Sequence, residues 1–194
     1  KPGKAINLGL SAPGHHDYVI ILSAHCLPLN VDWMKNLVEF MDAYPSVAGA
    51  YGRQHPMNFT NDENTRDLVI TFRDETNVNR SMFFHNANSI VRGSVILKHP
   101  FNDQIKHIED IVWARDVIEA GFDLGYVKEA GVTHFHGTNQ HETDYLSLRG
   151  KGLTNVFLNE GLTRKISLLD LFETSELRFQ TICFASDCNC DSQS

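Results

Sequence analysis

DYVIILSAHCLPLNVDW, residues 17–33, carries the strongest structural signal in the chain. Val19–Leu22 is apolar at every position, which is typical of a strand inside a parallel sheet. The polar stretch Ser23-Ala24-His25-Cys26 follows at once, and the apolar spacing after Asp32 predicts a helix with one buried face. We therefore expect a buried strand that presents polar side chains at its tip.

Strands and helices alternate outward from this stretch, which predicts an α/β sheet. The expected strands are Val19–Leu22, Ser46–Tyr51, Met82–Phe84, Ser89–Arg92, Leu124–Val127 and Val132–Phe135. One helix is expected from Asp32 to just before Pro45, and a second over Ile108–Ala120. Residues 1–16 read as a loop with a short helix near Ala5–Leu10, and the polar residues 53–80 read as a long excursion.

The chain is expected to divide near residue 137. Residues 1–137 contain the alternating elements, whereas residues 138–194 read as a helical C-terminal extension. The small polar residues at the very end predict disorder there. Because the chain begins with Lys1 and not with Met, we expect a fragment or a processed product.

Composition excludes several classes of protein. The formal net charge is −7 and no stretch is strongly basic, so a nucleic-acid partner is not expected. No apolar run approaches the length of a membrane span, and no signal peptide is visible. The four cysteines do not form the paired spacing of a zinc site, which favours free thiols in a reducing cytosol; they are Cys26, Cys183, Cys188 and Cys190.

The first candidate cluster is Ser23 and His25 at the tip of the expected strand. Ligands of open α/β sheets bind beyond the carboxyl ends of strands, and alternation along an extended chain would put both side chains on one side. A neutral imidazole nitrogen suits a transition metal such as Mn²⁺. The competing interpretation is that His25 is a core histidine with its hydrogen bonds satisfied.

The second cluster is Glu109 and Asp110 in HIEDIVWARDVIEAG, residues 107–121. Both carboxylates fall at the start of a helix, where the positive end of the helix dipole stabilises negative charge. Such charge matching explains them without any function. The functional interpretation is that one carboxylate is a general base which the helix holds against a substrate hydroxyl.

The third cluster is His134 and His136 in GVTHFHGTNQH, residues 131–141. The two histidines are two residues apart at the end of a strand, so their side chains would share a face. They could ligate one metal or line one pocket, and the competing interpretation is two surface histidines.

In order along the chain, these motifs resemble the inverting GT-A fold glycosyltransferases of family two, and bacterial surface-polysaccharide members in particular. Asn7 and Gly9 match an Asn-x-Gly stretch, and Ser23-Ala24-His25 occupies the place of an Asp-x-Asp or Asp-x-His motif. The further matching segments are Val47–Pro56, Phe83–Val95, His99–Asp103 and Glu109–Gly137. The resemblance covers about residues 1–140.

The resemblance implies a fold and an activity. The expected fold is a partial GT-A, Rossmann-like mixed sheet flanked by helices, with the helical C-terminal appendage. The implied activity is transfer of a sugar from a nucleotide-sugar donor to a glycan or lipid-linked acceptor, with inversion, in capsule or other surface polysaccharide synthesis. The implied location is the cytoplasm or the inner face of the membrane, where peripheral association is open.

The resemblance also assigns roles to residues. Asp110 matches the catalytic base, with Glu109 as its neighbour. The residues implied as ligands of Mn²⁺ or Mg²⁺ are His25, His134 and His136. The residues that fall where the family shapes the donor and acceptor cleft are Asn7, Ser23, Asn86, Asn88 and Arg92.

Two departures from the family pattern lead to further expectations. Ser23 stands where an aspartate is expected, so the site loses a negative charge and should bind metal more weakly. The family's first strand and its acidic nucleobase-binding residue have no counterpart, so we expect little turnover by this chain alone and an exposed sheet edge. Such an edge invites pairing with another copy of the chain.

Two other functions remain open from the sequence. The first is a non-catalytic module that binds a sugar nucleotide or a glycan on the same scaffold, which the serine at position 23 favours. The second is a metal hydrolase using His25, His134 and His136, which would need a further carboxylate ligand and a metal-activated water.

Overall fold

The computed structural model describes residues 1–134, apart from 11–13, 15, 59, 61 and 106–107, and all of these residues belong to one compact unit. The expected boundary near residue 137 and the helical extension 138–194 lie outside the described residues. The helices are α1 (Pro2–Leu10), α2 (Trp33–Ala43), α3 (Asp62–Thr71), α4 (Gly93–Ile96) and α5 (Glu109–Glu119). The strands are β1 (Tyr18–Leu22), β2 (Cys26–Pro28), β3 (Val47–His55), β4 (Asn77–Asn79), β5 (Asn88–Arg92) and β6 (Asp123–His134).

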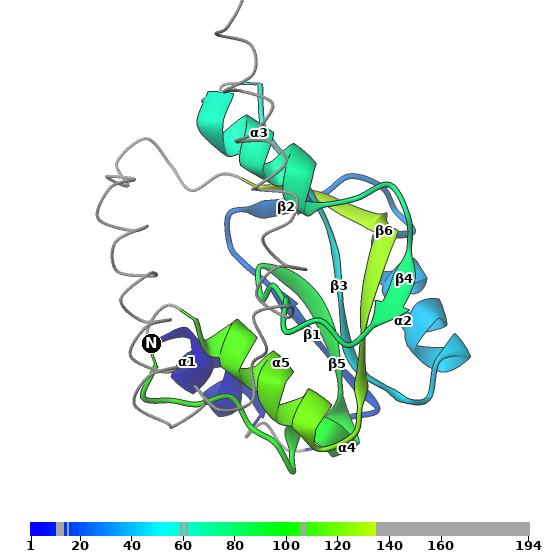
Figure 1. Ribbon diagram of the computed structural model, residues 1–194, viewed down its shortest axis with the longest axis vertical. Coiled ribbons are helices and arrows are strands. Elements are labelled where there is room, and N and C mark those ends of the chain that lie inside the picture. Colours follow the sequence, from blue (N-terminus) through cyan, green and yellow to red (C-terminus); the bar gives the residue numbers. More distant parts are fainter. Residues whose placement is uncertain (11–13, 15, 59, 61, 106–107, 135–194) are drawn as a thin grey trace, which may run out of the picture. The chain divides into compact units, whose positions relative to one another are not determined.

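The strands form one six-stranded mixed sheet, in agreement with the expected α/β fold (Figure 1). Its order is β1-β5-β3-β6-β2, and β4 pairs with the first part of β6. β3 and β6 run parallel, whereas the other pairs are antiparallel. β6 therefore pairs with β4 along its first part and with β2 at its end.

The position of β1 corrects one expectation. The apolar run Val19–Leu22 does not lie inside a parallel sheet, because β1 pairs antiparallel with β5 and no second strand borders it among the described residues. Its apolar character has another cause. Val19 and Ile21 pack on one side of the sheet, while Tyr18 and Ile20 pack on the other. Helices cover both faces, so the first four positions of the strand face apolar neighbours, whereas Leu22 at its end is exposed.

Other elements also differ from the sequence-based expectation. Leu124–Val127 and Val132–Phe135, expected as two strands, belong within the described residues to the single strand β6, which runs on through exposed Lys128 and Glu129. The polar excursion 53–80 contains the end of β3, the helix α3 and the strand β4. Residues 82–84, expected as a strand, lie in the loop before β5, and α4 was not anticipated.

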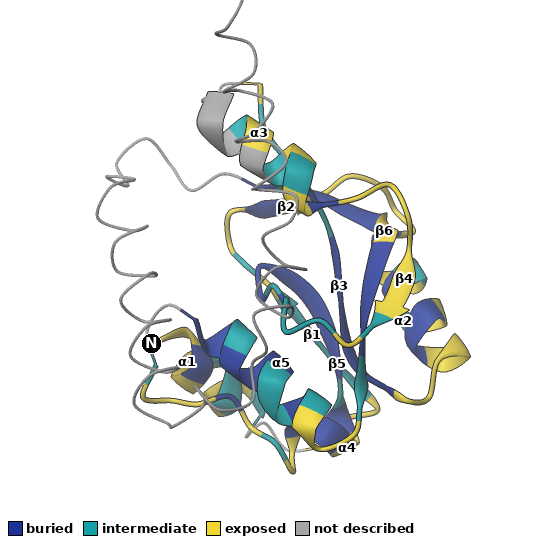
Figure 2. Cartoon of the chain, viewed as in Figure 1, coloured by how far each residue is buried: buried dark blue, intermediate teal, exposed yellow. Residues whose placement is uncertain are grey.

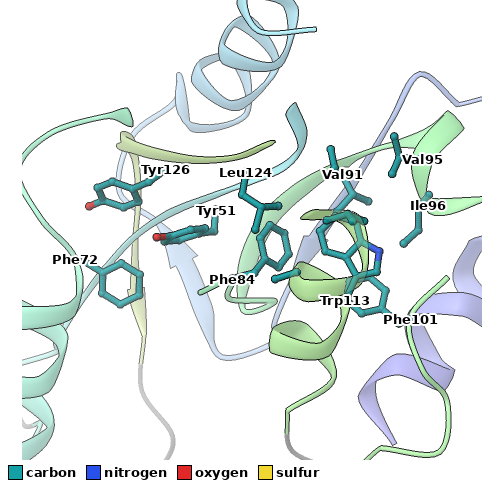
Figure 3. Close-up of a cluster of buried hydrophobic side chains, with 13 residues drawn as sticks. Tyr51, Phe72, Phe84, Val91, Val95, Ile96, Phe101, Trp113, Leu124 and Tyr126 are labelled. Atoms are coloured by element: carbon teal, nitrogen blue, oxygen red, sulfur yellow. The ribbon is translucent and has the colours of Figure 1, made fainter. Parts of the chain in front are cut away.

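Two apolar clusters occupy the two faces of the sheet (Figure 2). α2 covers one face, and its buried side chains are Trp33, Leu37, Phe40 and Met41. α5 covers the other face, where Trp113 stacks on Phe101 with ring centroids 5.2 Å apart (Figure 3). The Trp113 indole nitrogen donates to the carbonyl of His99 at 2.8 Å, so this large ring is buried without an unpaired donor. The start of α5 is thereby fixed against the sheet.

None of the helices in the described part of the chain combines the length and the apolar character that crossing a bilayer would require.

Candidate functional site

A tight turn connects β1 to β2 at the predicted motif. The Cys26 amide donates to the Ser23 carbonyl at 2.9 Å, and the Ser23 amide donates to the Ala87 carbonyl at 2.9 Å. Residues 23–26 thus form a hydrogen-bonded β-turn and not an extended segment. The expected alternation of Ser23 and His25 along a strand is therefore wrong, and His25 stands exposed on the turn.

The end of β6 brings a second histidine to this turn. β2 lies beside the end of β6 (Figure 1), and in their antiparallel pairing Cys26 lies opposite His134. The Nε2 atoms of His25 and His134 are 2.8 Å apart, and their rings stack with centroids 4.7 Å apart. His134 is only 2% exposed, whereas His25 faces solvent. Two residues 109 positions apart in sequence thus point their ring nitrogens at one spot.

Cys26 completes a compact set of metal-ligating atoms. Its sulfur and one ring nitrogen of each histidine lie within 4.8 Å of one another, a cluster unique within the described residues. The thiol is buried, and burial raises the pKa of Cys26 to about 11, although a hydrogen bond of the sulfur with the Ser23 backbone lowers that pKa in part. The cluster therefore holds a neutral thiol beside two imidazoles.

This donor set fits a divalent metal ion. Bonds of about 2.1 Å at tetrahedral angles place two ligating nitrogens about 3.4 Å apart, so His25 and His134 would separate by about half an ångström. His25 lies on an exposed turn and can make that movement. His136, the third predicted ligand, lies outside the described residues.

A third imidazole borders the pair from the loop before β5. The ring of His85 meets that of His134 edge to face, with centroids 5.9 Å apart. It also lies 6.1 Å from the ring of Phe72, which belongs to the apolar cluster under α5. His85 was not singled out from the sequence, although its neighbours Asn86 and Asn88 were.

The predicted acid–base pair lies at the start of α5. Glu109 and Asp110 are 6% and 8% exposed, an unusual degree of burial for carboxyl groups. The Asn86 amide nitrogen donates to Glu109 Oε1 at 3.2 Å, and the Ile111 amide donates to Asp110 Oδ1 at 2.9 Å. The buried Asn86 Oδ1 has no hydrogen-bond partner.

The consecutive residues His85 and Asn86 connect the two groups of side chains. His85 contacts the ring of His134, and Asn86 hydrogen-bonds Glu109. Because adjacent Cα atoms are about 3.8 Å apart, the histidine pair and the start of α5 border the same short segment. The imidazoles and the carboxyl groups thus lie on either side of one short segment of the chain.

Three of the predicted donor-cleft residues are instead engaged in holding the fold. Asn7 exchanges two hydrogen bonds with the Phe101 backbone, at 2.7 and 3.1 Å. Arg92 lies at the opposite end of β5 from Asn88 and donates to the carbonyls of Met41 and Val47. At about 3.3 Å per residue, the two ends of β5 are about 13 Å apart. Parts for Asn7, Asn88 and Arg92 in donor binding stay predictions.

Asn88 is the most deeply buried of the three. It accepts from the Trp33 indole at 2.8 Å and donates to the carbonyls of Ala130, at 2.8 Å, and Arg53, at 3.3 Å. The side chain is fully buried, so it joins α2, β3 and β6 inside the protein.

Replacing Asn88 with alanine should therefore lower the free energy of unfolding by about 2–4 kcal/mol, because it leaves buried polar groups unpaired. Urea unfolding followed by circular dichroism measures the change. Asn30→Ala, which removes one hydrogen bond at an exposed position, is the matched control and should change stability little. Equal effects of the two substitutions would contradict a structural role for Asn88.

One buried polar side chain escaped prediction altogether. Gln54 near the end of β3 is 2% exposed, and neither its amide oxygen nor its amide nitrogen has a hydrogen-bond partner. At the next position, burial, and secondarily the charge of Arg53, lower the pKa of His55. A glutamine between Arg53 and His55 carries no spacing signal of burial, so only the three-dimensional fold reveals it.

The fold is that of glycosyltransferases of known structure. One is the mannosyltransferase PcManGT from Pyrobaculum calidifontis, in complex with GDP-Man and Mn²⁺, with a TM-score of 0.62 and 12% sequence identity. The match covers 91% of this chain and 48% of the mannosyltransferase chain. A second is GalNAc-T7 with UDP, GalNAc and Mn²⁺, with a TM-score of 0.54 and 12% identity, where the match covers 92% of this chain and 40% of the GalNAc-T7 chain. A third is TarS from S. aureus, with a TM-score of 0.51 and 12% identity, where the match covers 91% of this chain and 58% of the TarS chain.

The matches cover most of this chain but only part of each solved structure. The chain spans about half the length of the solved structures that it resembles. At 12% identity the likeness shows the fold alone. No protein-family model and no curated protein sequence matches the chain.

Proposed function

We propose that this chain supplies the metal-binding and acid–base half of an inverting glycosyltransferase domain that uses a nucleotide-sugar donor. The observation that carries the proposal is the meeting of His25 Nε2 and His134 Nε2 at 2.8 Å, linked through His85 and Asn86 to the buried carboxyl groups of α5. The glycosyltransferase fold supplies the context, and three matched structures contain GDP-Man or UDP.

In this proposal Asp110 is the general base. Inverting transfer requires one group to take the proton of the acceptor hydroxyl as the new bond forms. Asp110 lies on the first turn of α5, a rigid element whose apolar face is locked into the core by Trp113. Glu109, held by the Asn86 amide, lines the same site and fixes the position of the helix start.

His25 and His134 would hold the metal ion through their Nε2 atoms, with His136 as a further proposed ligand. A bound divalent ion supplies Lewis-acid neutralisation of the departing diphosphate. His134, buried and placed by the β2–β6 pairing, provides a fixed ligand, while exposed His25 provides an adaptable one. The open side of the pair is the solvent side, where a diphosphate would enter.

The proposed acceptor is a glycan or a lipid-linked sugar of bacterial surface polysaccharide synthesis, at the cytoplasmic side of the membrane. This setting is supported by the order of the sequence motifs. Because the chain spans about half of the matched structures, we also propose that it turns over donor poorly by itself.

A second candidate function is a non-catalytic module that binds sugar nucleotides. The observation that favours it is Ser23, which offers a hydroxyl where a carboxylate ligand would strengthen metal binding. The buried carboxyl pair at the start of α5 favours catalysis, because burying two acids without a task is costly.

Binding of UDP and GDP, measured by titration calorimetry with Mn²⁺ and then with excess EDTA, tests the proposal. We expect binding with the metal and at least about tenfold weaker binding after its removal, because the diphosphate charge is then uncompensated. Phosphate at the same concentration is the control ligand. Nucleotide binding of equal strength with and without EDTA would contradict a metal-centred donor site.

A further inference from the structure

The three ligand atoms at the β1–β2 turn are of a soft or borderline kind. They are two imidazole nitrogens and one sulfur, from His25, His134 and Cys26. We propose that Cys26 is the third protein ligand of this centre and that its thiolate makes the site selective for Zn²⁺ or Co²⁺ over Mn²⁺ and Mg²⁺. The inference rests on the proposed function only in taking this cluster to be the metal centre of a donor site.

The backbone fixes Cys26 at the centre. Its amide closes the turn on Ser23, and its pairing with His134 across β2 and β6 places both side chains on one face of the sheet at its end. Both residues are almost fully buried, at 4% and 2% exposure. The strand pairing therefore holds the backbone of Cys26 beside that of His134.

The chemistry of the ligands sets the preference. Thiolate and imidazole suit Zn²⁺ and Co²⁺, whereas Mn²⁺ and Mg²⁺ prefer carboxylate and other oxygen ligands. Ser23 brings no carboxylate to the turn, and Cys26, on binding, releases its thiol proton to solvent and supplies the missing negative charge. With His25, His134 and Cys26 as its protein ligands, so that Cys26 takes the place proposed above for His136, the ion keeps one open position, which is the arrangement of zinc sites that act on substrates.

The competing interpretation is that Cys26 is only a small core side chain. It does pack in the apolar cluster that includes Trp33 and Ala87. Packing of its β-carbon does not prevent the sulfur from reaching the two nitrogens, since all three ligand atoms lie within 4.8 Å of one another. Spectroscopy of the metal–sulfur bond separates these interpretations.

Cobalt titration of the full chain tests the assignment, in a background in which the other cysteines are replaced, namely Cys183→Ser, Cys188→Ser and Cys190→Ser. Cys26 is then the single thiol. We expect a thiolate-to-cobalt charge-transfer band in the near ultraviolet that saturates at one Co²⁺ per chain and disappears when Zn²⁺ is added. Cobalt bound without that band would overturn the proposal, because the ligand sulfur would be absent.

Competition between metals gives the selectivity. In the same background we expect Cys26→Ser to weaken Zn²⁺ binding at least about tenfold and to change Mn²⁺ binding little, because a hydroxyl replaces the thiolate. An unchanged ratio of Zn²⁺ to Mn²⁺ affinity would overturn the proposal. Should Cys26→Ser fail to fold, the cobalt band of the single-thiol parent remains decisive.

The outcome is independent of the proposed transferase function. A thiolate–cobalt band in a chain that binds no nucleoside diphosphate would support the ligand assignment and count against the donor site. Mn²⁺-dependent nucleotide binding without the band would do the reverse.

Discussion

Asp110→Asn should lower the rate of sugar transfer by about a hundredfold to ten-thousandfold, the usual contribution of a general base. The amide has nearly the shape of the carboxyl group but cannot take the proton of an acceptor hydroxyl. Binding of the nucleoside diphosphate should be unchanged, because Asp110 acts on the acceptor side. Initial rates with a nucleotide-sugar donor, in the protein as the cell makes it, measure the first effect, and calorimetry measures the second.

The matched control is Glu119→Gln, which removes a carboxylate from an exposed position at the other end of the same helix. It should leave both transfer and binding unchanged. If Asp110→Asn transfers sugar at the parent rate, Asp110 has no part in proton transfer, and the buried pair is structural. If it abolishes nucleotide binding as well, the site is organised differently from our account.

His134→Ala should weaken divalent-metal binding by at least about a hundredfold. Changes to groups that merely orient metal ligands already cost 10- to 100-fold in affinity, and this change removes a proposed ligand itself. Metal-dependent nucleotide binding should fall in parallel. Competition with a chelating dye measures the metal affinity, and calorimetry measures the nucleotide affinity.

Burial of His134 requires two checks on this experiment. Its ring is 2% exposed, so unfolding by urea must show that the variant is folded under assay conditions. His25→Ala removes the exposed partner and should weaken metal binding with little effect on stability. His16→Ala, at an exposed position before β1, is the control and should change neither property. Parent-like metal affinity in both His25→Ala and His134→Ala would refute a centre at this pair.

Much of the fold could be predicted because its elements carry local signals. The apolar run at β1, the helical spacing from Trp33 and the apolar face of α5 identified their elements. The pairing of β1 could not be predicted, because a strand covered by helices on both faces reads the same in a parallel or an antiparallel sheet. α4, only four residues long, gives no periodic signal of its own.

The sequence predicts which residues belong to the candidate site better than it predicts how they are arranged. Position in the sequence singles out His25, His134 and the acidic pair, since each follows or ends a strand or begins a helix. The turn at residues 23–26 and the contact of His85 with His134 depend on pairings between distant segments. Cys26 was set aside as a free thiol, because the strand that places it opposite His134 could not be foreseen.

Diffraction from crystals of this protein grown with a divalent metal and a nucleoside diphosphate tests the central claim most directly. Our account predicts one ion bonded to the Nε2 atoms of His25 and His134 at about 2.1 Å, with diphosphate oxygens at its open side. Asp110 should face the same site across the His85–Asn86 segment. An ion bound elsewhere, or a nucleotide remote from these two imidazoles, would contradict the account.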